Sequence, residues 1–176
     1  AKKAVEKMKK SGVVTGVKTS KGIAFDANGK TTREMMACFV IRMLGIDETQ
    51  YSGMDLAAYY DDYEEISDWA VNAVKAATAL GILSGAASGG KNYVYAQNNI
   101  TREQFAVVLV RAIKKDKMNV SGYSLKYTDA SSISSWAKTY VKIISKLGYM
   151  TGSNNKFMPK NNITRAEIVQ TFANMD

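Results

Sequence analysis

The sequence has 176 residues, of which 46% are hydrophobic and 10% aromatic, so the chain can bury a sizeable core and disorder is excluded. Twenty-four basic and sixteen acidic residues give a net charge of +8, which favours an anionic partner such as nucleic acid, anionic lipid or an acidic polysaccharide. The sequence contains no histidine, the commonest general base and metal ligand, and we therefore predict no catalysis, no metal and no cofactor.

The first segment, AKKAVEKMKK, is basic but lacks the uninterrupted apolar stretch of a signal peptide, so an export signal is expected to have been removed or to lie outside this sequence. No apolar run approaches the roughly 20 residues of a membrane-spanning helix, and we predict no membrane insertion. The single cysteine, Cys38, lies among apolar neighbours and is expected to be a packed core thiol and not a reactive one.

One pattern occurs three times along the chain. The segment WAVNAVKAATALGILSG (69–85) aligns without gaps with WAKTYVKIISKLGYMTG (136–152), and AVEKMKKSGVVTG (4–16) is a third copy that lacks the tryptophan. Apolar residues at three- and four-residue spacing predict a helix in each segment. A glycine in a left-handed conformation is expected to end each helix, and these glycines are Gly12, Gly81 and Gly148.

A variable loop with a short extended piece follows each of these helices, and a second predicted helix begins at a Thr-Arg pair. Because such a pair of helices cannot bury its apolar face alone, we expect the copies to share one core. The three copies are placed at 1–50, 51–118 and 119–176. In the second copy, the residues expected to be buried are Ala70, Ala73, Val74, Ala77 and Leu80 on the first helix and Phe105, Val108, Leu109, Ala112 and Ile113 on the second.

Threonine is the expected N-cap of each second helix. Two copies carry the residues of a capping box, which are Thr101 with Gln104 and Thr164 with Glu167. In the first copy a methionine stands where the glutamate or glutamine should be, so the box is expected one residue earlier, between Thr31 and Glu34.

An arginine occupies the first turn of all three second helices, at Arg33, Arg102 and Arg165. The helix dipole disfavours a positive charge there by about 0.3–1 kcal/mol, so capping does not explain it. One interpretation is an ion pair, for example of Arg165 with Glu167 or with an acid of a neighbouring copy. The other interpretation, which we favour, is an anion receptor made of the guanidinium and the free helix N–H groups, with a carboxylate as its ligand.

A small hydroxyl residue and a glycine follow each first helix. Such a turn lets a ligand approach the backbone closely, or it simply ends the helix. The three pairs are Thr15 with Gly16, Ser84 with Gly85, and Thr151 with Gly152.

Two further kinds of residue recur beside the first helices. Trp69 and Trp136 open two of them, and an indole can stack on a sugar ring, although packing is the favoured interpretation. Asp62 and Asp129 each lie seven residues before a tryptophan. They can cap a turn, bind the hydroxyls of a ligand or pair with the arginine of another copy, and the ion pair is the default expectation.

An aromatic-x-Asp followed by WA, then LG[IY]xxG, then [FY]x[PA]xxxITR[AE][EQ] before an apolar helix resembles the S-layer homology repeat. All landmarks are present in the second and third copies. The first copy lacks the entry segment and the tryptophan, and Phe25-Asp26-Ala27 replaces the usual Phe-x-Pro.

The resemblance implies a mainly α fold, in which three helix-loop-helix repeats form a pseudo-threefold trimer within one chain, with a central helical bundle and three prongs. It also implies a non-catalytic anchor, secreted to the cell surface as part of a larger surface protein. Grooves between repeats would bind secondary cell-wall polysaccharide through a terminal pyruvylated N-acetylmannosamine, using Arg33, Arg102 and Arg165 beside Gly16, Gly85 and Gly152. The alternative ligand is modified peptidoglycan.

Two other classes of function have sequence features that point to them. A glycan-active enzyme would need paired carboxylates, and the acidic residues Asp61, Asp62, Glu64 and Glu65 are instead expected to be solvated surface. Nucleic-acid binding would use the positive charge, but no recognised motif is present and the aromatic residues follow core spacing, so we predict no nucleic-acid partner.

Overall fold

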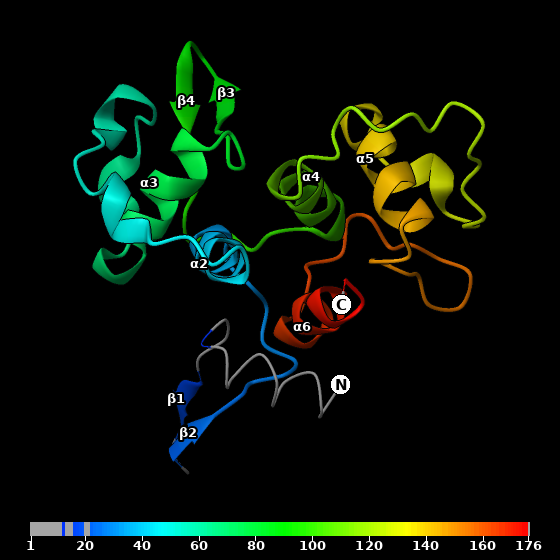
Figure 1. The fold of residues 1–176 in the computed structure, drawn as a ribbon, viewed down its shortest axis with the longest axis horizontal. Coiled ribbons are helices and arrows are strands. Elements are labelled where there is room, and N and C mark those ends of the chain that lie inside the picture. The colour runs from blue at the N-terminus through cyan, green and yellow to red at the C-terminus, as the bar shows by residue number, and fades with distance from the viewer. Residues whose placement is uncertain (1–11, 13–15, 20–21, 176) are drawn as a thin grey trace. The chain divides into compact units, whose positions relative to one another are not determined.

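A computed structural model describes residue 12, residues 16–19 and residues 22–175 of the chain. This part is mainly helical (Figure 1). Its α-helices are α2 (Arg33–Met43), α3 (Val71–Ala79), α4 (Arg102–Ala112), α5 (Ser135–Lys146) and α6 (Arg165–Ala173). Short 3-10 helices lie at Glu48–Tyr51, Leu56–Ala58, Tyr63–Glu65, Asp68–Ala70 and Ala130–Ser132.

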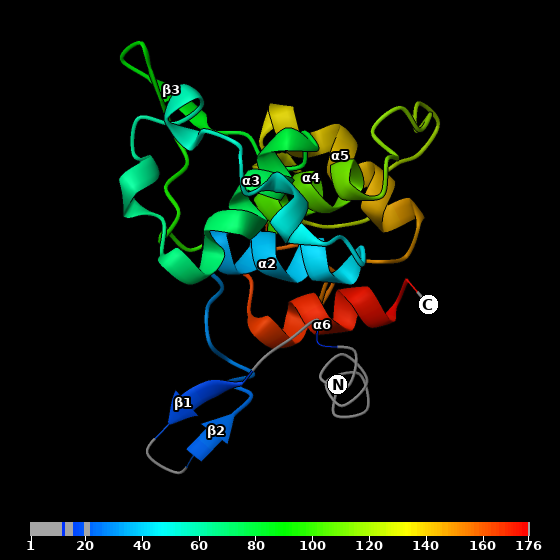
Figure 2. The same cartoon turned by 60° about the vertical axis from the view of Figure 1, so that its left-hand side comes forward.

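Two antiparallel hairpins supply the extended pieces that were predicted between helices. Strand β1 (Val17–Thr19) pairs with β2 (Gly22–Ala24), and β3 (Ala86–Ser88) pairs with β4 (Lys91–Tyr93) (Figure 2). At the equivalent place in the third copy, the pairing shrinks to a single bridge between Ser153 and Lys156. We call each hairpin, or the single bridge in the third copy, together with its loop an arm. Each arm leads the chain back to the start of a second helix.

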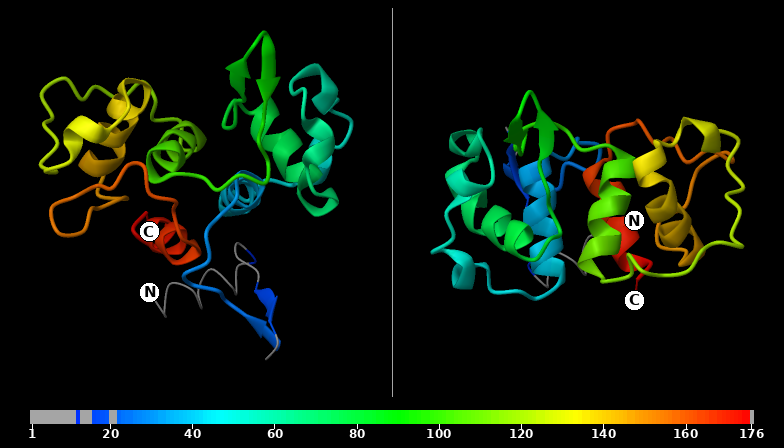
Figure 3. Two further views of the ribbon diagram at one scale, coloured as in Figure 1. Left: turned by 180° about the vertical axis from the view of Figure 1, so that it is seen from behind. Right: turned by 90° about the horizontal axis from the view of Figure 1, so that it is seen from above.

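The chain divides into two compact units, Thr31–Asn99 and Ala1–Lys30 with Ile100–Asp176. In the first unit α2 packs against α3, and in the second unit α4 packs against α5 (Figure 3). In both, the second helix of one copy packs against the first helix of the next. The repeat boundaries at 1–50, 51–118 and 119–176 stay a prediction from the sequence.

Local signals place the helix ends well. Thr32, Thr101 and Thr164 are the N-caps, and the two capping boxes that the sequence predicts, at Thr101 and Thr164, are formed. Gly81 and Gly148 follow their helices with φ of +68° and +75°, which confirms the left-handed ends. The helix predicted before Gly12 lies outside the described residues, and Gly12 itself has a positive φ.

The capping box predicted one residue earlier in the first copy is wrong. Thr32, and not Thr31, caps α2 and accepts from the N–H of Met35. Glu34 does not reach back to the cap, because its carboxylate binds Ser67. Glu34 therefore binds Ser67, which is distant in the sequence, and not the neighbouring Thr31.

Helix α4 is buried on almost all sides, since nearly all of its residues from Arg102 to Val110 are buried. Phe105 packs on Phe172 of α6 with ring centroids 6.2 Å apart. The predicted buried faces are right for most positions, but Leu80, at the end of α3, is 40% exposed.

Cys38 is 1% exposed, which confirms a packed thiol, and burial raises its pKa to about 11. In the part of the chain that is described, no helix is long and apolar enough to cross a membrane.

Candidate functional site

The N-terminal N–H groups of the second helices are already bonded. The first two N–H groups of α2 donate to the carbonyls of Asn98 and Ala96, and those of α4 donate to Asn161 and Pro159. In α6, Arg165 and Ala166 donate to Gly29 and Ala27. The expectation of free helix N–H groups beside each arginine is therefore wrong. These bonds come from the loop of another copy, which the sequence alone does not identify.

The same contacts connect the copies in a fixed order. The first N–H groups of the first copy's second helix donate to the loop of the second copy. Those of the second copy's helix donate to the loop of the third copy, and those of the third copy's helix donate to the loop of the first copy. Isolated bridges mark the same three places, pairing Thr32 with Asn99, Thr101 with Asn162 and Thr164 with Lys30. Each of the three helix starts is thus completed by the loop of another predicted copy.

Arg33 and Arg102 make equivalent bonds to these loops. Arg33 donates from Nε to the carbonyl of Val94 at 2.6 Å and from Nη2 to that of Ser84 at 3.2 Å. Arg102 donates in the same way to Phe157 at 2.8 Å and to Thr151 at 3.1 Å. Carbonyl dipoles thus compensate for a cation at the electropositive end of these two helices, which explains Arg33 and Arg102 without any ligand.

Arg102 has an additional partner, an acid from the next copy. Its Nη1 contacts Oε1 of Glu167 at 2.8 Å, and its guanidinium lies 5.1 Å from the Phe157 ring centroid. The ion-pair interpretation is therefore right for this arginine, through a neighbouring copy. Glu167 serves two purposes, because its other oxygen accepts from Thr164 in the capping box.

The other two arginines lie in desolvated surroundings. Burial lowers the pKa of Arg33, and electrostatic interactions with Tyr60 and Asp62 oppose that effect. Burial likewise lowers the pKa of Arg165, opposed by Asp26, and the Arg165 guanidinium lies 5.1 Å from the Phe25 ring centroid. A desolvated cation gains from any further oxygen ligand.

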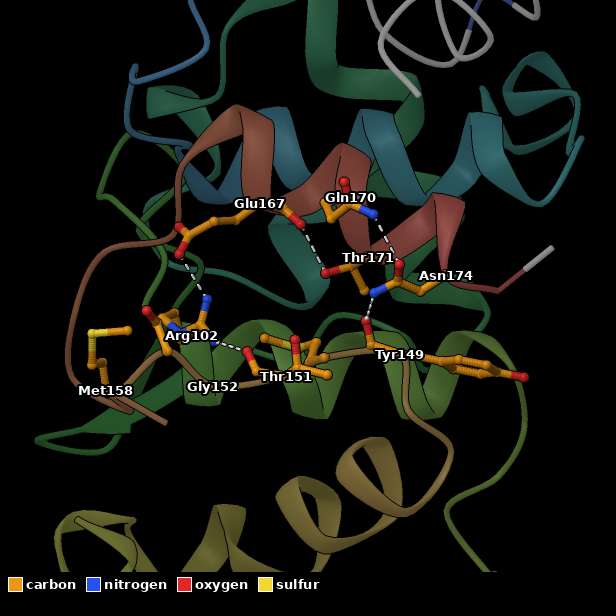
Figure 4. A pocket seen from close by; sticks show the side chains of 11 residues that line it. Arg102, Tyr149, Thr151, Gly152, Met158, Glu167, Gln170, Thr171 and Asn174 are labelled. Carbon is orange, nitrogen blue, oxygen red and sulfur yellow. Dashed lines mark hydrogen bonds and ion pairs between the residues drawn. The ribbon is translucent and has the colours of Figure 1, made fainter. Parts of the chain in front are cut away.

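A pocket of about 160 Å³ lies beside Arg102, between the second and third copies (Figure 4). We call it the neutral pocket. Arg102 and Glu167 are its only charged lining residues, and they are paired with each other. In Figure 4, Arg102 lies between Glu167 of α6 and Thr151 of the loop after α5. The other lining residues are Tyr149, Met150, Thr151, Gly152, Ser153, Met158, Gln170, Thr171 and Asn174.

A second pocket, of about 400 Å³, adjoins the neutral pocket. Arg102, Met158 and Glu167 line both, so they form the boundary between the two. The remaining lining residues are Lys30, Lys160, Asn161, Asn162 and Thr164, and we call it the lysine pocket. In the described part of the chain, no cluster of acidic and cysteine residues is arranged to hold a metal ion.

The acid that follows the arginine joins consecutive copies. Glu34 accepts from the N–H and the hydroxyl of Ser67 at 3.0 and 2.9 Å. Glu103 accepts from the same two groups of Ser134, both at 3.0 Å, and from Lys160 at 2.6 Å. Sequence reasoning missed this pair, although a serine stands two residues before each tryptophan. In the third copy the position is Ala166.

Replacing Glu103 by alanine is expected to lower the free energy of unfolding by about 2–4 kcal/mol, because two hydrogen bonds from Ser134 and an ion pair with Lys160 are lost from a buried carboxylate. Urea denaturation measures this change. Glu65→Ala is the control, since Glu65 is exposed, and it should change stability by less than about 0.5 kcal/mol. Equal losses of stability in the two variants would contradict a role for Glu103 in joining consecutive copies.

Asp62 and Asp129 do not form the ion pairs that were expected by default. The two carboxylate oxygens of Asp62 accept from the N–H groups of Val94 and Tyr95 at 2.7 and 2.8 Å. Those of Asp129 accept in the same way from Phe157 and Met158. Each aspartate therefore holds the end of its own arm, as in the turn-capping alternative. A role in binding ligand hydroxyls stays a prediction.

The glycines of the loops after α3 and α5 have a structural reason. A Cβ at Gly152 would overlap the carbonyl oxygen of Lys156 and the ring of Tyr127, and one at Gly85 would overlap the side chain of Asn92. The atoms that approach these glycines closely therefore belong to the protein itself and not to a ligand. Thr151 and Gly152 do line the neutral pocket. Gly16 lies just before β1, and Thr15 lies outside the described residues.

Trp69 and Trp136 are each 53% exposed, so packing accounts for only half of each indole. Neither lines the neutral pocket or the lysine pocket. Stacking of these rings on a sugar stays a prediction.

Comparison with known proteins identifies the family. The S-layer homology domain matches residues 59–106 and 126–169, which leaves the first copy outside both segments. An amylopullulanase of Thermoanaerobacterium thermosulfurigenes is 32% identical over 95% of this chain and 8% of its own length. The Cellulosome-anchoring protein of Acetivibrio thermocellus is 28% identical over 84% of this chain and 32% of its length. The S-layer protein EA1 of Bacillus anthracis is 30% identical over 61% and 12%.

The chain belongs to the S-layer homology family, whose domains are non-catalytic anchoring modules. This membership places it at the cell surface or cell wall. The chain spans only 8% and 14% of the lengths of two relatives that are named as enzymes, the amylopullulanase and an exoglucanase of Acetivibrio thermocellus.

Proposed function

We propose that the chain anchors a larger surface protein to the cell wall by binding an acidic secondary wall polysaccharide in grooves between adjacent repeats. The polymer unit would carry a pyruvyl ketal on N-acetylmannosamine, and the three copies would form a pseudo-threefold trimer with a central helical bundle. One observation carries the proposal: Arg102 lines a pocket built by two copies at once. A groove of this kind exists only where copies meet.

The chemistry of the groove suits a sugar. The neutral pocket combines hydroxyl and amide groups of Thr151, Ser153 and Gln170 with the apolar surface of Met158. A guanidinium has five N–H donors, and the described contacts of Arg102 use three of them. The other two belong to a side chain that is only 6% exposed, so only a ligand seated in the pocket can reach them. The net charge of +8 adds a long-range attraction to an acidic polymer.

A cosedimentation experiment with purified cell walls tests this function. The chain should bind untreated walls, should bind weakly to walls whose pyruvyl ketals have been removed by mild acid, and should not bind walls stripped of secondary polymer. Equal binding to the untreated and ketal-free walls would contradict the acidic ligand. Equal binding to the stripped walls would instead favour modified peptidoglycan, the alternative ligand.

A charge-conserving variant tests the part played by the arginine. Arg102→Lys keeps the positive charge but loses the planar fork, so we expect wall binding to weaken about tenfold. The matched control is Arg111→Lys at the last turn of the same helix, outside both pockets, which should bind as the unmodified chain does. Folded content of each variant is checked by circular dichroism. If the two variants bind alike, Arg102 does not contact the polymer.

A further inference from the structure

The two pockets beside Arg102 differ in charge. In the neutral pocket the only charged groups are Arg102 and Glu167, and they cancel. The lysine pocket is lined by three cationic side chains, Lys30, Arg102 and Lys160, against one anionic side chain, Glu167. The positive charge of the groove is therefore concentrated on one side of the Arg102–Glu167 pair.

Glu167 works against an acidic ligand at the arginine. Its carboxylate already holds Nη1 of Arg102, whose side chain is only 6% exposed. A second carboxylate placed there would meet a like charge and little accessible guanidinium surface. An acid bound on the lysine side meets the Lys30 ammonium and the Lys160 ammonium without displacing Glu167. Lys160 is paired with Glu103, so part of its charge is compensated, but its side chain is still 57% exposed to a ligand.

The two lysines are held on well-defined backbone. Lys30 is exposed and follows the loop that accepts from the N–H groups of Arg165 and Ala166, and its backbone pairs with Thr164. Lys160 contacts Glu103 and Ser134 through Nζ, while its side chain remains 57% exposed. The lysine pocket thus joins an arm of the first copy to the third copy.

We propose that this groove has two subsites: an uncharged sugar ring occupies the neutral pocket, and the acidic substituent of the polymer binds Lys30 and Lys160 in the lysine pocket. The proposal rests on the proposed function and assigns a different part of the groove to the acid. Because an ammonium acts as a point charge, the acid can be a carboxylate or a phosphate.

Three small probes test the assignment by NMR titration: methyl N-acetylmannosaminide, its pyruvyl ketal and its 6-phosphate. The neutral probe should shift the backbone amide of Ser153 alone, and each acidic probe should also shift that of Asn161. Lys30→Gln and Lys160→Gln should each weaken the acidic probes about fivefold and leave the neutral probe unchanged. The ketal and phosphate arms show which acid the pocket prefers. Lys138→Gln, on the exposed side of α5, is the control for loss of one charge.

Several results would overturn the assignment. They are acidic probes that shift Ser153 without Asn161, lysine variants that bind them as the unmodified chain does, or no shift with any probe. Cosedimentation with walls, run on the same variants, separates this failure from that of the proposed function. If the unmodified chain and both lysine variants bind walls equally, only the lysine subsite is wrong. If the unmodified chain does not bind walls at all, the anchoring function is wrong.

Discussion

Replacing Arg102 by alanine is expected to lower the free energy of unfolding by about 2–4 kcal/mol and to weaken wall binding more than Arg102→Lys does. The truncation leaves the carbonyls of Phe157 and Thr151 without this donor and leaves Glu167 without its cation. Solvent screens part of the last effect, because the Glu167 side chain is 37% exposed. The arginine thus holds two copies together whether or not a polymer is bound.

Urea denaturation of the Arg102→Ala chain measures the stability effect, and cosedimentation at a temperature where the variant is folded measures binding. Lys115→Ala, at an exposed position just beyond the same helix, is the control for loss of one positive charge. A variant that loses binding with less than about 0.5 kcal/mol of stability would show that Arg102 serves the ligand alone. Such a result would contradict the structural role described above.

Replacing Asp129 by alanine should destabilise the chain by a similar amount, about 2–4 kcal/mol, through a different mechanism. The Asp129 carboxylate binds the N–H groups of Phe157 and Met158. Met158 has φ of +57°, an unfavourable conformation for a residue with a side chain. Without the carboxylate this turn is expected to relax. The Phe157 carbonyl would then move away from Nε of Arg102.

Thermal denaturation followed by circular dichroism tests this expectation. Asp62→Ala is a second test, because Asp62 holds Tyr95, with φ of +50°, in the same way. Asp116→Ala is the surface control, since Asp116 is exposed. If Asp129→Ala is as stable as the control, the turn does not depend on the carboxylate.

Features that depend on neighbouring residues in the sequence were predictable. The Thr101 and Thr164 capping boxes and the left-handed glycines at 81 and 148 form over a few residues, so the same signals appear in the sequence and in the structure. The burial of the Cys38 thiol was predictable in the same way, from its apolar neighbours in the sequence. Repetition of these signals also revealed the copies.

Contacts between copies were not predictable, because the period of the repeat does not say which loop meets which helix. Glu34 had a local partner in Thr31 and a distant one in Ser67, and the distant one prevailed. Asp62 and Asp129 bind backbone N–H groups that no sequence motif marks. The lysine pocket was likewise not predictable from the sequence, since Lys30 and Lys160 are far apart in the chain and only the fold brings them together.

The completion of each helix start by a loop of another copy has a consequence for how such modules can evolve. The helix start of the third copy is completed by carbonyls of Ala27 and Gly29, and that of the first copy by Ala96 and Asn98. A gene duplication that added a fourth unit, or a deletion that left two, would give at least one helix a loop it was not matched to. Recombination among surface-protein genes would therefore be expected to keep together copies whose loops and helix starts match.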